Sequence, residues 1–238
     1  MLFFDLEAYA PPHERDASRG SLIINPARPG HPLLGGCFLS RRFTAPPSGS
    51  ALEAPGEAPG EAPGEALESL DALEVQGLWL WDLGSERALL EAIRERFELE
   101  WTRQREENAR ILGKPVVDLV VCGAGIARFD LPALYCRSLH HALASPAELF
   151  ELYFKARPID LSNEAGFLFP EEPHLYPKTT RELAGRLGLR EHKGSSKSVW
   201  ELYERGEHAA IARRTAAELR LVVALYERLR ARVVAARR

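Results

Sequence analysis

The sequence predicts an α/β domain. Two runs of large apolar or β-branched residues, at 1–9 and 116–122, predict strands that are covered on both faces. Apolar residues at spacings of three and four predict long amphipathic helices over 86–112 and from 208 onward. Strands come early in the chain and helices alternate with them later, which is the order typical of this class.

Length and composition allow one sizeable core and exclude several classes of protein. The chain has 238 residues and a net charge of -3, so it carries no global basic field for nucleic acid, although a local basic rim is compatible with it. No apolar stretch is long enough to cross a membrane, and Asp5 interrupts the first apolar run, so a signal peptide is not expected. Cys37, Cys122 and Cys136 are scattered without metal-ligand spacing, which favours a reducing, cytoplasmic setting.

The first third of the chain contains four predicted strands and one segment that cannot form a core. Pro, Gly, Ser and Glu dominate residues 45–69, with a tandem Glu-Ala-Pro-Gly repeat beginning at Glu53. This composition has almost nothing to bury, so it predicts a disordered insertion within the domain. The predicted strands cover 1–9, 21–24, 36–40 and 75–81.

Helices dominate the rest of the chain. Ser85 is a start signal for the helix over 86–112, and Pro115 ends that stretch. The strand at 116–122 leads through a glycine-containing turn into a helix with Pro132 in its first turn. Further helices are predicted to end near 143, to cover 146–155 and 180–187, and to begin near 208, with a short strand near 158–161.

Two carboxylates in the first strand are the first indication of chemistry. Asp5 and Glu7 are two residues apart, and because side chains alternate along a strand, both point to the same face. Two like charges beside each other repel unless a cation lies between them, and a hard divalent metal prefers oxygen ligands. An exposed edge strand with solvated acids is the alternative.

Asp130 follows the second predicted buried strand and precedes a helix. Its ordinary role in that place is an N-cap, in which the carboxylate accepts backbone N–H bonds. Metal contact is compatible with capping, because the strand ends of α/β sheets are where such sites gather.

Glu218 lies within the apolar stripe of the last helix. A carboxylate in that stripe points into the core, where an unpaired charge is very costly. It therefore needs an arginine, a proton or a metal. The apolar or uncharged members of the stripe are Ile211, Thr215, Val222, Leu225, Leu229 and Val233.

Together these acids resemble the motifs of the DEDD 3′-5′ exonuclease superfamily, which has a ribonuclease-H-like fold. The first motif matches Asp5-Leu6-Glu7, the second matches Phe129-Asp130-Leu131-Pro132, and the third matches Glu218 within 211–219. Within that superfamily the chain resembles predicted exonucleases related to the proofreading domains of family-B DNA polymerases. The resemblance covers all but 10–35 and 45–74. It implies a single domain over 1–238, with a mixed β-sheet flanked by helices.

The resemblance also implies a function. Asp5, Glu7, Asp130 and Glu218 are expected to hold two Mg²⁺ or Mn²⁺ ions and thereby to act as the catalytic residues. The expected substrate is single-stranded nucleic acid with a free 3′ end, whose phosphodiester bonds are hydrolysed one after another from that end.

The chain departs from the family pattern at three places. Gly125 replaces an Asn four residues before the family's Phe, and Glu218 replaces the usual Asp. The Tyr or His that orients the attacking water in the family is replaced by Arg213 or Arg214, and His208 lies about one turn too far away. An alternative is therefore a degraded ribonuclease-H-like module that binds nucleic acid or a protein partner without cutting. A third interpretation is a scaffold protein whose acids form arginine pairs.

Several further residues are candidates for substrate binding. Leu6 and Phe129 could wedge the terminal base, or simply pack in the core. Arg214 could contact a phosphate, or form an ion pair with a neighbouring acid. Lys193 and Lys197 could contact the strand backbone, or be solvated in their loop. Asp160 could lie near the site, or cap a turn.

Overall fold

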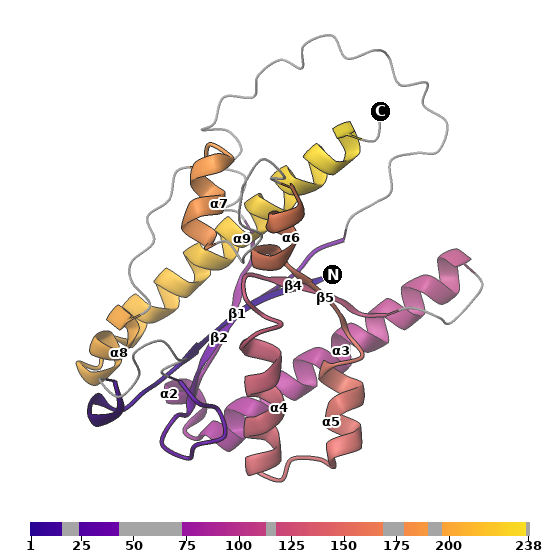
Figure 1. Ribbon diagram of the computed structural model, residues 1–238. Coiled ribbons are helices and arrows are strands. Elements are labelled where there is room, and N and C mark those ends of the chain that lie inside the picture. The colour runs from indigo at the N-terminus through magenta and orange to yellow at the C-terminus, as the bar shows by residue number, and fades with distance from the viewer. Residues whose placement is uncertain (16–23, 43–72, 113–117, 169–178, 190–196, 237–238) are drawn as a thin grey trace.

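A five-stranded sheet lies between two layers of helices in the computed structural model (Figure 1). Some strand pairs are parallel and others antiparallel, so the predicted α/β class with a mixed sheet flanked by helices is confirmed. The structure describes residues 1–15, 24–42, 73–112, 118–168, 179–189 and 197–236.

The first strand lies at the centre of the sheet, in the order β3-β2-β1-β4-β5. β1 (Leu2–Ala8) pairs antiparallel with β2 (Leu33–Ser40) and parallel with β4 (Val120–Gly123). The two edge strands are β3 (Gln76–Trp79), antiparallel to β2, and β5 (Arg157–Asp160), parallel to β4.

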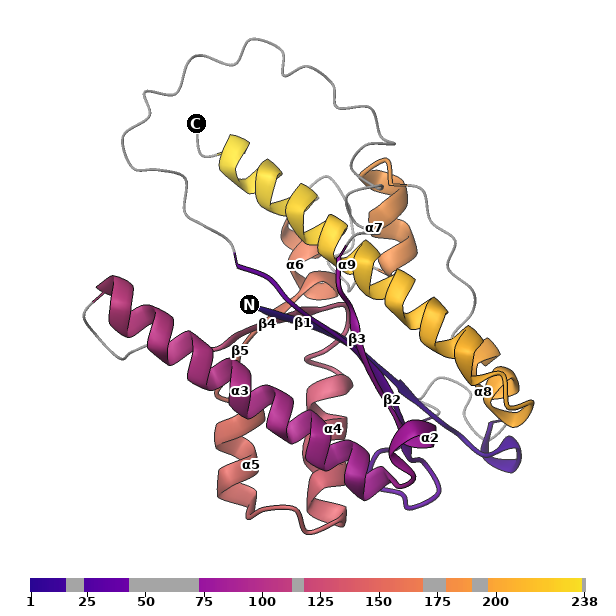
Figure 2. The same ribbon diagram turned by 180° about the vertical axis from the view of Figure 1, so that it is seen from behind.

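Helices cover both faces of the sheet, as the two opposite views show (Figures 1 and 2). One layer consists of α3 (Glu86–Leu112), α4 (Asp130–His140) and α5 (Pro146–Tyr153). The other consists of α9 (His208–Ala236), which packs on β1 and β2, and of α6 (Leu161–Leu168), α7 (Thr180–Arg186) and α8 (Lys197–Glu204), which pack against α9. Two short elements are the 3₁₀ helix η1 (Pro12–Glu14) and α2 (Leu80–Leu83).

Alternate residues of β1 fill two separate cores. Phe3 points to the α9 layer and meets Tyr226 edge to face, whereas Phe4 points to the α3 layer and meets Phe97 edge to face. Both phenylalanines are fully buried. Asp5 and Glu7 are in phase with Phe3, so β1 directs both acids to the α9 layer.

The long elements agree with the sequence predictions, and the differences lie at short elements and element ends. β1, α3, α5, α7 and α9 lie where they were predicted, while β2 begins three residues earlier than expected. The strand predicted over 75–81 ends at Trp79, because α2 begins at Leu80 and is closed by Gly84 in the left-handed region. α6 and α8 were not predicted. The strand at 21–24 falls almost wholly outside the described residues, and the insertion at 45–69 wholly outside them.

None of the described helices combines the length and hydrophobicity that a membrane crossing requires.

Gly35 in β2 is required by both its backbone angle and its surroundings. Its φ is 133°, and a Cβ at this position would lie 2.2 Å from the carbonyl oxygen of Leu78 and 2.6 Å from the ring of Trp79. Gly35→Ala is therefore expected to lower the free energy of unfolding by about 3 kcal/mol or more, measured by denaturant titration.

Gly84→Ala is the matched control for this substitution. Gly84 also has a positive φ, of 79°, but a Cβ there would meet nothing within 4 Å. Its expected loss is only the backbone term, about 1–2 kcal/mol. Equal losses at the two positions would contradict the steric argument for Gly35.

Candidate metal centre

Three carboxylates from the two ends of the chain meet on the α9 face of the sheet. Asp5 and Glu7 come from β1, and Glu218 comes from the middle of α9, where that helix crosses β1. One ligand oxygen from each lies within 4.8 Å of those of the other two. The structure thus brings together the first and third of the predicted acidic motifs.

Asp130 lies outside that group of three but contacts β1 directly. It is the first residue of α4, it is buried, and its Oδ1 accepts the backbone N–H of Leu6 at 3.0 Å. Leu6 stands between Asp5 and Glu7, so the fourth predicted acid is anchored beside the pair. The N-cap interpretation of Asp130 is wrong, because Phe129 occupies the N-cap position and the carboxylate bonds to β1.

The sheet itself explains why that contact exists. β1 pairs with β4 only through Leu2 and Phe3, so the two strands have parted before Leu6. The N–H of Leu6 is buried and needs an acceptor, and the carboxylate of Asp130 supplies one.

Asp160 holds the loop that leads to Asp130. It is buried at the end of β5, and its carboxylate accepts backbone N–H bonds from Gly125 at 2.8 Å, Ala127 at 3.0 Å and Ser162 at 3.1 Å. Gly125 has a φ of 84°, a conformation in which glycine is unstrained. These contacts support the turn-capping interpretation of Asp160, and Asp160 also lies close enough to the site for its charge to raise the pKa of Asp130.

Asp160→Ala is expected to lower the free energy of unfolding by about 2–4 kcal/mol, because three backbone N–H groups lose their acceptor. Chemical denaturation measures this loss. Glu164→Ala is the control. It removes an exposed carboxylate in the first turn of the adjacent helix α6, which does not brace the loop. A loss as small as in the control would contradict the bracing role of Asp160.

Burial and mutual repulsion disturb the ionisation of the cluster. The pKa of Glu7 is raised to about 8, first by burial and then by the charges of Asp5 and Glu218. Arg214 and the hydroxyl of Thr215 act in the opposite direction without cancelling the rise. Burial and the charge of Asp5 likewise hold the pKa of Asp130 well above its usual range.

Arg214 contributes positive charge within the cluster. Its Nε donates to Oε1 of Glu218 at 2.9 Å, and its terminal nitrogen donates to the hydroxyl of Ser198 at 2.7 Å. The prediction that Arg214 forms an ion pair with a neighbouring acid is therefore confirmed. Arg214 also lowers the pKa of Glu7, but burial and the charges of Asp5 and Glu218 outweigh it.

The donor set fits a hard divalent cation. All the converging ligand atoms are carboxylate oxygens, which Mg²⁺ and Mn²⁺ prefer. A bound cation would favour the charged forms that burial and repulsion now disfavour. Asp5, Glu7 and Glu218 could hold such an ion, with Asp130 beside them.

Thr215 is a site residue that was counted only as part of the apolar stripe. Its hydroxyl donates to Oε1 of Glu7 at 3.0 Å, which orients that carboxylate. A hydroxyl one turn before Glu218, on a buried helix face, was the available signal.

The other predicted contact residues have varied positions. Leu6 is buried in the core of the α3 layer, on the opposite face of the sheet from Glu7, which favours the core-packing interpretation. Phe129 is half-buried and packs against the same core. Lys193 lies outside the described residues. Lys197 is the first residue of α8, and the structure describes its backbone but not its side chain.

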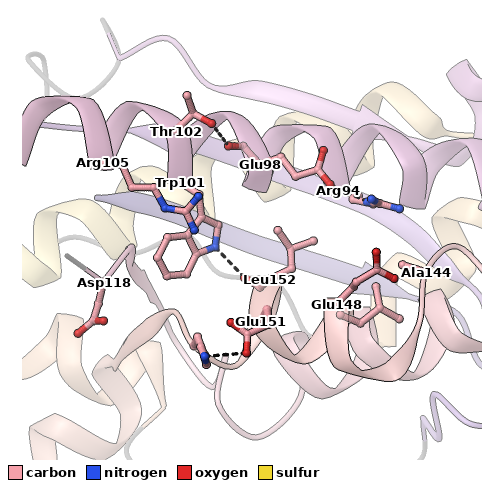
Figure 3. Close-up of a pocket in the computed structure, with 12 residues that line it drawn as sticks. Arg94, Glu98, Trp101, Thr102, Arg105, Asp118, Ala144, Glu148, Glu151 and Leu152 are labelled. Carbon is pink, nitrogen blue, oxygen red and sulfur yellow. Dashed lines mark hydrogen bonds and ion pairs between the residues drawn. The ribbon is translucent and has the colours of Figure 1, made fainter. Parts of the chain in front are cut away.

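A cleft of about 640 Å³ lies elsewhere, between α3 and α5 (Figure 3). Trp101 lines it and donates its indole N–H to the carbonyl oxygen of Leu152. Its charged groups include the ion pairs Arg94–Glu98 and Lys155–Glu151. The four carboxylates of the candidate metal centre do not line this cleft.

No protein-family model matches the chain, and no curated protein is similar to it in sequence.

Proposed function

We propose that the protein is a metal-dependent 3′-5′ exonuclease that acts on single-stranded nucleic acid. The observation that carries the proposal is the convergence of Asp5, Glu7 and Glu218, from opposite ends of the sequence, with ligand oxygens within 4.8 Å of one another. Asp130 lies beside them through its bond to Leu6. The strand order and the mixture of parallel and antiparallel pairs are compatible with a ribonuclease-H-like fold.

The four acids would act as ligands and not as nucleophiles. Bound there, Mg²⁺ or Mn²⁺ would activate water and stabilise the charge that develops on the leaving 3′ oxygen. Thr215 keeps one oxygen of Glu7 oriented, and Arg214 does the same for Glu218. The guanidinium of Arg214 also places positive charge where a phosphate would be received.

The direct test uses a 5′-labelled single strand, incubated with the protein and Mn²⁺. The proposal predicts a series of products that become shorter from the 3′ end. The same strand with a blocked 3′ terminus should remain intact, because the enzyme needs a free end. Internal cleavage of the blocked strand would contradict exonuclease action.

A non-cutting module is the second candidate, and two contacts favour it. Arg214 stands where the superfamily has its water-orienting Tyr or His, and it is engaged with Glu218. His208 is engaged elsewhere, because its ring stacks on Trp81 with centroids 4.4 Å apart. Stabilisation by Mn²⁺ together with intact strands under all conditions would select this candidate.

A further inference from the structure

Three aromatic rings form a parallel stack on the α9 side of the sheet. Trp79 at the end of β3 stacks on Trp81 of α2, with centroids 4.8 Å apart and an interplanar angle of 8°. Trp81 stacks in turn on His208 at the start of α9, at 4.4 Å and 6°. Trp79 is buried, whereas Trp81 and His208 are half-buried, so the stack runs from the sheet toward solvent.

Glycines make the base of this stack flat. A Cβ at Gly77 would lie 2.4 Å from the indole nitrogen of Trp79, and one at Gly35 would lie 2.6 Å from its six-membered ring. The indole of Trp79 therefore lies across β3 and β2 in space that any other residue would fill.

The stack and the carboxylates share one face of the sheet. Glu7 pairs with Gly35 in β2, and Gly35 pairs with Trp79 in β3, so the three lie in one row across the strands. Two strand spacings separate Glu7 from Trp79, which is about 10 Å. Along α9, His208 precedes Glu218 by about 15 Å of helical rise. A strand of a few nucleotides spans these distances.

The geometry of the stack differs from that of three core pairs, whereas a fourth core pair, Phe4–Phe38, is also parallel at 10° but with its centroids 6.1 Å apart. Phe3–Tyr226, Phe4–Phe97 and Phe97–Tyr153 meet edge to face, with interplanar angles of 72°, 73° and 83°. Rings in a core prefer such arrangements to face-to-face stacking. A parallel stack offers flat π-faces, which are the surfaces that nucleobases use.

Charges beside the stack are already paired with one another. Arg15 bonds to Glu204 at 2.5 Å, and Arg205 bonds to Glu207 at 2.6 Å. The rings of Tyr203 and Tyr9 adjoin the stack. The centroid of the Tyr203 ring lies 5.8 Å from that of His208 and 5.2 Å from that of Tyr9. Aromatic faces without surplus positive charge suit bases better than phosphates.

We propose that the outer face of His208, with Trp81 stacked behind it, forms a nucleobase subsite, at which a base of a single strand stacks while the 3′ end of the strand lies at the carboxylates. The inference deepens the proposed function and rests on it. In this proposal the aromatic subsite recognises a base of the strand, and the metal centre recognises the phosphate at its 3′ end.

The test compares the affinity of variants for a labelled oligothymidylate by fluorescence anisotropy, with Ca²⁺ in place of Mg²⁺. Trp81→Ala should weaken binding by roughly 5- to 150-fold, the effect of losing one base–aromatic stack, because His208 loses the ring that holds it in place for the base. Trp81→Phe should retain most of the affinity. Phe150→Ala is the matched control, because Phe150 is an exposed aromatic on α5, in the opposite layer, and should leave the affinity unchanged.

Abasic strands separate stacking from structural damage. Removing the bases of the strand should weaken its binding to the wild type. The same removal should weaken binding to Trp81→Ala much less, because both changes disrupt the contact between a base and the aromatic stack. His208→Ala gives a second variant that removes the outer ring, with the same expected non-additivity. Equal affinity of Trp81→Ala and wild type, or equal losses on abasic and ordinary strands, would overturn the subsite.

Failure of the subsite differs from failure of the nuclease. If the proposed function is wrong, the wild type leaves strands intact in Mn²⁺, yet the affinity ratios between variants can still be measured. If only the subsite is wrong, strands are shortened and the ratios are unity.

Discussion

Replacing Asp5 by asparagine is expected to abolish shortening of a single strand in Mn²⁺, with a rate loss of roughly a hundredfold or more. Changes to residues that merely support metal ligands cost 10- to 100-fold, so loss of a central ligand should cost at least as much. The charge of Asp5 acts on both Glu7 and Asp130, because it raises the pKa of each. Gel separation of a 5′-labelled strand measures the rate.

The same substitution should stabilise the protein when no metal is present. Asparagine preserves the shape of Asp5 and removes one charge from a group of mutually repelling carboxylates, so the melting temperature should rise. Loss of activity together with a gain in stability cannot result from misfolding. Asp118→Asn is the matched control, because Asp118 is exposed and lines the separate cleft between α3 and α5. Equal degradation by wild type and Asp5→Asn would refute the nuclease assignment.

Stability of the metal-free protein is expected to fall as the pH rises from about 4.5 to about 8. The pKa of Glu7 is about 8 in the folded protein against 4.5 for an ordinary glutamate, so the folded state holds its proton more tightly than the unfolded chain. Between those two values the unfolded chain releases the proton first, which costs the folded state about 1.4 kcal/mol per pH unit. Above pH 8 both states are ionised and the loss levels off. Thermal melts across this range measure the slope.

Saturating Mn²⁺ should cancel this pH dependence. The metal binds the ionised carboxylates, so its apparent affinity should rise by about tenfold per pH unit below 8, with release of a proton. At a concentration 100 times its dissociation constant it should add about 2.7 kcal/mol of stability. Isothermal titration in two buffers of different protonation enthalpy measures both quantities.

Glu7→Gln supplies the control for these titrations. Glutamine cannot ionise, so the metal-free variant should show a flatter pH profile and should bind Mn²⁺ weakly at every pH. If Mn²⁺ leaves the melting temperature of the wild type unchanged, the acids are satisfied within the protein, and the scaffold interpretation gains support.

The parts of the site that follow from local periodicity could be predicted from sequence. The alternation of a strand is sufficient to put Asp5 and Glu7 on one face, and the spacing of apolar residues on the last helix is sufficient to direct Glu218 inward. Long elements with many periodic positions, such as α3 and α9, were found for the same reason.

Other parts depend on partners that are remote in sequence and carry no local signal. Asp160 braces a loop more than thirty positions before it, and Asp130 bonds to a strand at the far end of the chain. A residue at the start of a helix usually caps that helix, so sequence reasoning expected Asp130 to combine capping with metal contact and gave no sign of its bond to Leu6. α8 was missed because its serine-rich approach also suits a loop.

The hydrogen bond between Asp130 and the backbone of Leu6 makes Asp130 harder to replace during evolution than the other three acids. If the protein cuts nucleic acid as proposed, a descendant that lost this activity could exchange Asp5 or Glu7 for neutral residues and become more stable. Asp130 also closes a gap between two central strands, so such a descendant should keep it. An aspartate surviving alone at the head of α4 would then mark a former enzyme.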